Sequence, residues 1–221
     1  MNKAWSEQNK VMQLLIKKQA TFREGIETLL ELRQQLMEEL FQLEKELSRE
    51  EFNALPFPNV NGYHCKTIAY SIWHIFRIED IVAHTLIGKN EQIFFLEDYK
   101  SRINSPIITT GNELVKQQIS DFSAALNIDE LYQYIIAVKE NTDEMLRAFS
   151  YADMKRKMTD DDKENLKSLE VVSEDERAYW LIDYWCGKDV RGLIQMPFSR
   201  HWIMHIEASL RIKNKIHPKG N

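Results

Sequence analysis

Apolar residues recur along most of the chain at the spacing of one buried helix face. Only 7 Gly and 5 Pro interrupt the 221 residues. The first such segment runs from about Ala4 to Leu47 and predicts a long helix, which Gly25 kinks or divides. The second, from about Cys65 to Leu86, is apolar around much of its circumference, so we expect a well-buried helix. The inward stripe of the first segment is Ile26, Leu29, Arg33, Leu36, Leu40, Leu43 and Leu47.

Capping residues mark two further helices in the middle of the chain. Ser48 to Glu51 and residues 110–113 both have the form of a capping box, and the latter predicts a short helix to about Leu126. Asn127 has Glu130 at the matching position and is followed by an unbroken heptad stripe. We therefore predict a third long helix that begins at Asn127.

The last third of the chain alternates between charged and aromatic segments. Residues 150–172 are rich in charge, and residues 158–162 within them predict an exposed connection. Residues 173–176 are expected to cap a helix that Gly187 stops. We expect its aromatic side chains to pack in the core, with a platform for a substrate as the alternative; they are Tyr179, Trp180, Tyr184 and Trp185. The final helix is predicted from near Pro197 to about Ile216.

These patterns predict an all-α fold. Four principal helices with long connections favour a four-helix bundle, with an extra aromatic helix before the last one. No strand signal competes well, and the chain has no internal repeat. We expect one domain that spans residues 1–221.

The composition narrows the partners and the compartment. The chain is 43% hydrophobic and 29% charged with a net charge of −5, and Lys and Arg are not clustered. We therefore expect no nucleic-acid partner, and no apolar run approaches the roughly 20 residues needed to span a membrane. Cys65 and Cys186 are the only cysteines, and the first residues lack the apolar core of a secretory signal. A cytoplasmic location is the simplest expectation.

Two histidines lie on the inward face of the last predicted helix. His201 and His205 are four residues apart, which places them on one side of a helix. The apolar stripe that contains them is Ile194, Phe198, His201, His205, Ala208 and Ile212. Side chains in such a stripe point into the core, where an imidazole without a partner is costly. Either each ring is hydrogen-bonded to the surrounding protein, or the pair binds a metal ion.

A third histidine lies in the most apolar predicted helix. His74 is flanked on its own face by isoleucines, so we expect it to point into the core as well. If His74 joins His201 and His205, the three imidazoles form a site with one open position, which is typical of catalytic zinc. His64 and His84 each lie ten residues from His74, which rotates them off its face, and we expect both at the surface or at a helix end.

Several other chemistries are disfavoured. Glu79, Asp80 and Glu207 are near the histidines in sequence, but we expect them to be solvated or in surface ion pairs. Cys186 has no base tied to it by sequence, and an inert thiol is expected. No Glu is followed by His three positions later, which argues against a di-iron carboxylate bundle.

The residues around His74, the stretch from Arg200 to Ile206 with its H-x-x-x-H motif, and residues 47–56 resemble the DinB/YfiT-like superfamily. The resemblance covers most of the chain and implies a four-helix bundle with a divalent metal ion, zinc or nickel. It implies His74, His201 and His205 as the ligands. It also implies a small-molecule substrate, with a low-molecular-weight thiol among the candidates, and a possible homodimer. The chain departs from the pattern over residues 152–197, where an extra aromatic helix is placed to cover or reshape a substrate pocket.

Two functional hypotheses follow. The first is a metal-dependent enzyme with a three-histidine site, either a transferase that uses a low-molecular-weight thiol or a hydrolase. The second is a non-catalytic helical module whose histidines brace the structure, and which serves self-association or partner binding. A pocket at the histidines separates the two, because only the first hypothesis requires an open coordination position.

Overall fold

The computed structural model describes residues 2–60 and 62–218, and these residues form helices without any β-strand. This confirms the all-α prediction. None of the helices in the described residues is long and apolar enough to cross a membrane. The four longest elements, counting each π-helical segment with the α-helix it adjoins, are α2 (Phe22–Glu46), α4 with η2 (Ile68–Asp80 and Ile81–Gly88), α8 (Ile128–Ala148), and η4 with α12 (Met196–Arg200 and His201–Ile216).

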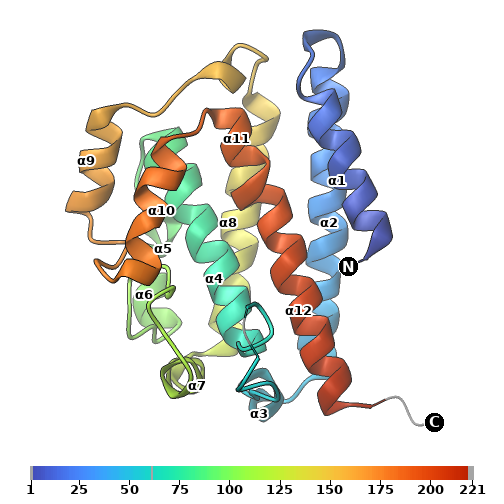
Figure 1. Ribbon diagram of the computed structural model, residues 1–221, viewed down its shortest axis with the longest axis vertical. Coiled ribbons are helices and arrows are strands. Elements are labelled where there is room, and N and C mark those ends of the chain that lie inside the picture. Colours follow the sequence, from blue (N-terminus) through green and yellow to red (C-terminus); the bar gives the residue numbers. More distant parts are fainter. Residues whose placement is uncertain (1, 61, 219–221) are drawn as a thin grey trace.

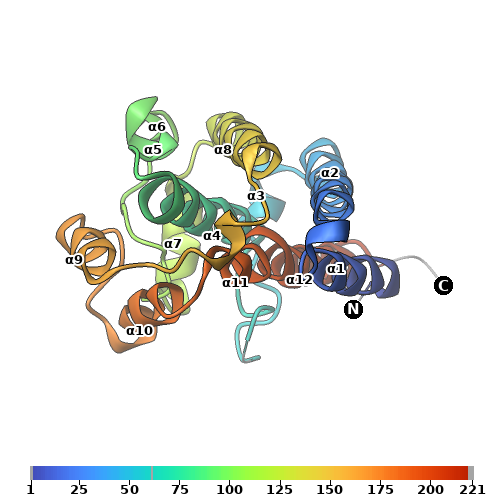
Figure 2. The same cartoon turned by 90° about the horizontal axis from the view of Figure 1, so that it is seen from above.

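The four long helices lie side by side, and each packs against two of the others. α2 contacts α8 and α12, and α4 contacts the same two helices (Figures 1 and 2). α4 and α8 run in one direction, while α2 and α12 run in the other (Figure 1). Two neighbouring helices with the same direction need a connection that returns along the molecule. Residues 89–127 make that return on the outside of α4 and α8, through α5 (Ile93–Leu96), α6 (Tyr99–Arg102) and α7 (Gln117–Ala125).

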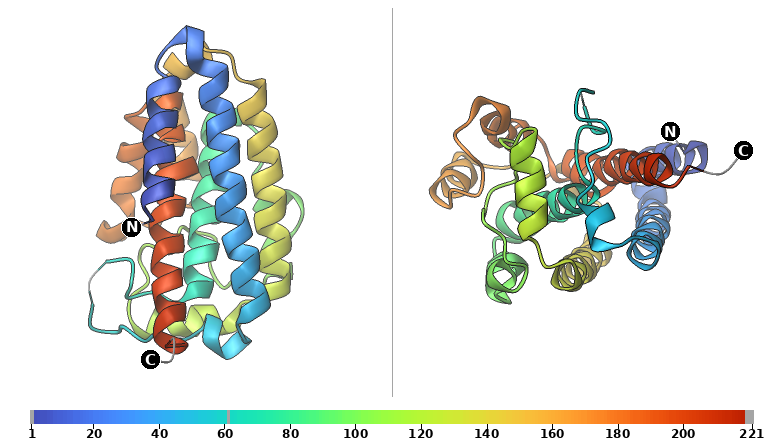
Figure 3. Two further views of the ribbon diagram at one scale, coloured as in Figure 1. Left: turned by 90° about the vertical axis from the view of Figure 1, so that its right-hand side faces the viewer. Right: turned by 90° about the horizontal axis from the view of Figure 1, so that it is seen from below.

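The N-terminal segment is a helical hairpin and not one long helix. α1 (Lys3–Leu15) packs antiparallel to α2, and the short 3₁₀ segment η1 (Gln19–Thr21) joins them (Figure 3). The predicted break at Gly25 is therefore wrong. Gly25 lies inside α2, and a Cβ added there would come within 2.6 Å of the Ile16 side chain. Glycine at this position lets the end of α1 approach the backbone of α2.

The second predicted helix begins later than expected and changes its winding. Thr67 caps α4 by accepting the N–H of Tyr70, so the helix starts at Ile68 and not at Cys65. From Ile81 to Gly88 the chain continues as the π-helix η2, which turns more slowly per residue than an α-helix. All thirteen residues of α4 are buried, as its apolar circumference predicts.

Capping signals gave mixed results elsewhere. Ser48 caps α3 (Arg49–Phe52) with a reciprocal capping box, and Asn127 caps α8 as predicted. The capping box at residues 110–113 was wrong. The Thr109 hydroxyl donates to Glu113, and Gly111 has a φ of 76°, so this stretch forms turns. The helix begins only at Gln117.

The connection after α8 is more ordered than its charge suggests. It contains η3 (Asp153–Lys155) and α9 (Asp160–Ser168). Thr159 and Asp162 form a capping box at the start of α9, and acidic residues in a first turn favour a helix. Residues 159–161 are exposed as predicted, but Met158 is buried, and the stretch begins a helix where the sequence predicted a connection. The next helix, α10 (Glu176–Cys186), is capped by Asp175 and ends at Gly187 as predicted. The short α11 (Val190–Ile194) precedes η4.

The buried apolar residues divide into two clusters that meet at one level of the molecule. On α2 the change from one cluster to the other falls between Leu30 and Leu32, and at the junction of η4 with α12 it falls between Phe198 and Trp202. Most of the buried ionisable groups lie at or near this level: Arg33, His74, Arg77, Glu79, Asp80, Asp143 and His201. The fold therefore carries a polar layer between two apolar cores.

Candidate metal centre

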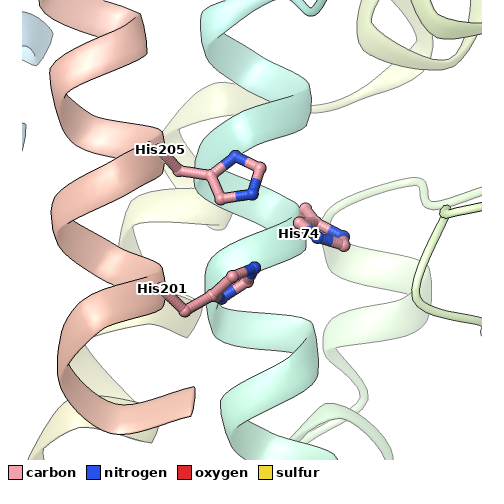
Figure 4. Close-up of side chains that lie close together, drawn as sticks. All are labelled: His74, His201 and His205. Carbon is pink, nitrogen blue, oxygen red and sulfur yellow. The ribbon is translucent and has the colours of Figure 1, made fainter. Parts of the chain in front are cut away.

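The three predicted histidines converge on one point between α4 and α12. His74 extends from α4, and His201 and His205 extend from successive turns of α12 (Figure 4). One ligand-capable nitrogen from each ring lies within 4.8 Å of the others, and the rings are only 3–6% exposed. We call these residues the histidine triad. The apolar stripe around His201 and His205 is buried as predicted.

The orientation of His74 is fixed by the chain itself. Its Nδ1 lies 2.6 Å from the carbonyl oxygen of Thr110. Because a carbonyl only accepts, Nδ1 carries the hydrogen, and Nε2 is left as the acceptor or metal ligand. The Tyr70 hydroxyl donates to the carbonyl of Gly111 at 2.9 Å and holds the same turn in place. An imidazole oriented through its second nitrogen by a carbonyl is the usual arrangement of a metal-ligating histidine.

The other two rings have hydrogen-bonding capacity that the protein does not use. The Nδ1 atoms of His201 and His205 are buried, and neither has a hydrogen-bond partner among the described residues. A buried polar atom left in this state costs roughly 1–3 kcal/mol. Three neutral imidazole nitrogens are a suitable donor set for zinc or nickel. The residues present therefore fit a divalent metal ion.

The triad is held in the neutral form that a metal ion requires. Burial lowers the pKa of His74 to about 4, although its hydrogen bond to Thr110 acts in the opposite direction. Burial also lowers the pKa of His201 and His205 well below the usual range, and the neighbouring histidines lower it further. A neutral ring has a free lone pair on one nitrogen. At neutral pH, protons therefore do not compete with a metal ion for that nitrogen.

A pocket of about 220 Å³ adjoins the triad. All three histidines line it, together with Tyr63, Asn112, and Met196 and Pro197 of η4. Its remaining residues include Trp180, Tyr184 and Trp185, which belong to α10. The connection at residues 152–197 therefore reshapes this site by forming one of its walls.

The aromatic residues of α10 do not all pack in the core as expected. Trp185 is buried, but Tyr179 is 41% exposed and Trp180 is 50% exposed. Trp180 and Tyr184 are in edge-to-face contact, with ring centroids 5.6 Å apart. The capping argument found which residues share this helix, but it could not identify the pocket that some of them line.

The predicted solvation of Glu79 is wrong. Its carboxylate is fully buried and accepts two hydrogen bonds from the Arg33 guanidinium, at 2.7 and 2.9 Å. Arg33 also donates from Nε to Asp143 at 2.6 Å, and Trp202 donates its indole N–H to Glu79 at 2.7 Å. Burial alone lowers the pKa of Arg33, but the two carboxylates raise it more, so it stays charged. We call Arg33, Glu79 and Asp143 the ion cluster; with Trp202 it joins α2, α4, α8 and α12.

Asp80 and His84 are also buried, contrary to expectation. Asp80 accepts the backbone N–H groups of Ile93 and Phe94 at 2.9 Å each, and the Tyr134 hydroxyl at 2.9 Å. His84 Nδ1 lies 2.8 Å from Asp80. The sequence argument treated this side of the helix as surface, whereas the segment after η2 folds back and donates to Asp80 from the backbone. Burial lowers the pKa of His84, but its hydrogen bonds to Asp80 and the charge of Asp80 together raise it more.

The remaining candidates lie outside the site. His64 contacts Arg211, and His217 pairs with Glu51 at 2.6 Å. Glu207 is partly exposed and accepts the backbone N–H of Asn2. Cys186 lines no part of the pocket, and burial raises the pKa of its thiol. This agrees with the prediction of an unreactive cysteine.

Comparisons with known proteins give a likeness of fold. No protein-family model matches the chain, and no curated protein matches it. One similar solved structure is described as the conserved protein of locus from Enterococcus faecalis. The superposition has a TM-score of 0.61 at 13% identity, and it covers 87% of this chain and 97% of that one. At this identity the likeness concerns the fold alone.

Proposed function

We propose that this chain is a metal-dependent enzyme on a DinB/YfiT-like four-helix bundle, in which the histidine triad holds one divalent metal ion, zinc or nickel. The observation that carries the proposal is the convergence of three buried imidazoles, two of which have a buried nitrogen without a partner among the described residues. A structural role for these histidines would leave that cost uncompensated.

The residues around the triad suit a reaction on a small molecule, either hydrolysis or transfer to a low-molecular-weight thiol. When bound, a divalent ion supplies Lewis acidity near neutral pH. The Thr110 carbonyl orients the ring of His74, and burial keeps all three rings neutral. The walls from α10 and η4 hold the substrate beside the histidines and exclude water from the apolar side of the pocket.

The pocket favours an enzyme over a module that binds metal only for bracing. A bracing site is expected to be closed by protein ligands on all sides. Here the three histidines lie on the surface of a pocket of about 220 Å³ that a small molecule can enter.

Metal analysis of the chain purified without a histidine tag tests the proposal. We expect close to one equivalent of zinc or nickel in the wild type and its loss in His201→Ala. His217→Ala is the matched control, because this histidine pairs with Glu51 at the surface and we expect full metal content. Metal content that stays the same in His74→Ala, His201→Ala and His205→Ala would reject the assignment.

Cobalt substitution separates the enzyme from the bracing module. In an open site, added azide or a small thiol should change the visible spectrum of the Co²⁺-loaded protein, because it enters the remaining coordination position. A spectrum that does not respond to either ligand would favour the module.

A further inference from the structure

One wall of the pocket is a set of aromatic rings that face the histidines. Trp180, Tyr184 and Trp185 all come from α10 and line the pocket with the triad. The Trp180 indole donates its N–H to the carbonyl of Arg177 at 2.9 Å, which fixes the ring although half of it is exposed. A large apolar ring held rigidly at the mouth of a pocket is typical of ligand contact.

Away from the histidine triad, where a metal ion would supply positive charge, the pocket offers no charge to an ionic ligand. Among the described residues that line it, none is Lys, Arg, Asp or Glu. Lys188 lies near the wall, with its ammonium 4.2 Å from the centroid of the Tyr184 ring. Burying a ligand charge without a counter-charge is costly, so these walls favour an uncharged molecule.

Asn112 supplies a polar contact in a pocket lined mostly by aromatic and apolar side chains. Its side-chain oxygen is buried and has no hydrogen-bond partner among the described residues. It follows directly on the turn that holds His74, since the carbonyl of Thr110 binds His74 Nδ1. An acceptor placed this close to the triad suits a ligand N–H or O–H group.

The size of the pocket limits the ligand to about one ring. An apolar cavity of about 150 Å³ holds one benzene molecule, whereas pockets for drug-sized ligands span roughly 300–1,000 Å³. The volume here, about 220 Å³, accommodates one ring with a short substituent.

We propose that this pocket binds an uncharged small molecule with one aromatic ring and a hydrogen-bond donor, the ring against Trp180 and the donor on Asn112. This rests on the proposed function to the extent that it names the substrate class of the same site. The ring contact and the Asn112 contact are made by the chain itself, so they can be tested apart from metal content.

Calorimetric titration of the full chain with three related probes tests the proposal. Benzamide is aromatic, uncharged and a donor; butyramide lacks the ring, and benzoate carries a charge and no donor. We expect benzamide to bind at least about tenfold more tightly than butyramide, which corresponds to one ring stacked in the pocket. Metal content is measured on the same sample, and benzoate is titrated with and without a chelator.

Two variants and a matched control identify the contacts. Trp180→Ala should weaken benzamide binding by about tenfold and leave butyramide unchanged, whereas Trp180→Phe should retain most of the affinity. Tyr179→Ala is the control, because Tyr179 is adjacent and similarly exposed but does not line the pocket. Toluene has the ring but no hydrogen-bond donor. Wild type should therefore prefer benzamide to toluene, and Asn112→Leu should remove that preference.

The outcomes separate this proposal from the proposed function. Benzamide binding no tighter than that of butyramide, or equal losses in Trp180→Ala and Tyr179→Ala, would overturn the substrate class even if the metal is present. Metal-free protein that still selects benzamide through Trp180 would support the pocket while the metal assignment fails. Tighter binding of benzoate than benzamide after chelation would also overturn the proposal.

Discussion

The histidine triad and the ion cluster are two buried polar groups in the same layer, and they differ in how completely the protein satisfies them. Every nitrogen of the Arg33 guanidinium and every carboxylate oxygen of Glu79 and Asp143 has a hydrogen-bond partner. In the triad, two ring nitrogens have none among the described residues, and the rings line a pocket. Both groups connect α4 to α12, the cluster through Trp202.

This difference indicates different roles for neighbouring groups. A fully satisfied ionic network contributes to the choice of one helix arrangement, and its removal leaves charges stranded. Buried polar atoms without hydrogen-bond partners raise the free energy of the folded state. A ligand that pairs with them lowers it. The ion cluster also holds α12 against α4, so it sets the distance across which His74 meets His201.

The largest expected effect comes from breaking the ion cluster. Arg33→Ala leaves Glu79 and Asp143 buried without their counter-charge, and we expect a loss of about 3–5 kcal/mol in the free energy of unfolding. Urea denaturation measures it. Gln34→Ala, which changes an exposed neighbour on α2, should cost less than about 0.5 kcal/mol. A loss below about 1 kcal/mol for Arg33→Ala would mean that the cluster is not the structural element described.

The triad should respond in the opposite way, because its stability depends on metal. Zinc at 100 times its dissociation constant should raise the free energy of unfolding of the wild type by about 2.7 kcal/mol. In His201→Ala that increase should disappear, while the metal-free variant should remain about as stable as the metal-free wild type. Denaturation with zinc and with a chelator gives both values. A His201→Ala variant as damaged as Arg33→Ala without metal would remove the distinction between the two groups.

Acid should destabilise the metal-free protein through the triad. The folded-state pKa of His74 is about 4 and its unfolded value is 6.5, so the unfolded chain takes up the proton first as pH falls. Stability from His74 is therefore complete above pH 6.5 and is lost as pH decreases toward 4. Between pH 7 and 5 the loss should be about 2 kcal/mol. His84, whose pKa is raised, acts in the opposite direction.

Denaturation of His74→Asn and wild type at both pH values isolates this contribution. The variant should lose about 2 kcal/mol less than the wild type over the same range. Equal pH dependence in the two proteins would contradict a buried neutral His74.

The sequence predicted the elements that depend on local patterns. The apolar stripe of α12 and the Asn127 cap involve residues within a few turns of one another, and both were confirmed. The break between α1 and α2 was misplaced at Gly25, and the helix α9 was missed. The first depends on packing of Ile16 against Gly25, and the second was hidden by a charge run that favours solvent.

The ion cluster was missed because each of its charged side chains can be buried only when the others neutralise its charge. Glu79 lies 46 positions from Arg33, and Asp143 lies 110 positions from it, so no local pattern links them. One signal was present: Arg33 occupies a position in the apolar stripe of its helix. An arginine in such a stripe requires buried acidic partners, and Glu79 lies on a helix that has almost no polar face. The shared inward face of His201 and His205 was predicted because their spacing and stripe are local on α12, whereas the resemblance to the DinB/YfiT-like superfamily implied that His74 joins them.

The smallest expected effect lies at the edge of the ion cluster. Lys139 donates to Asp143 at 2.8 Å, but its side chain is 14% exposed, and Asp143 keeps its bond to Arg33. Lys139→Gln should therefore cost about 0.5–1 kcal/mol, and added salt should reduce the difference. The Arg33→Ala loss should not depend on salt, because that cluster is shielded from water. Both losses are measured by urea denaturation at low and high salt. If they respond equally to salt, water reaches the ion cluster. Burial would then not distinguish the ion cluster from the triad that lines the pocket.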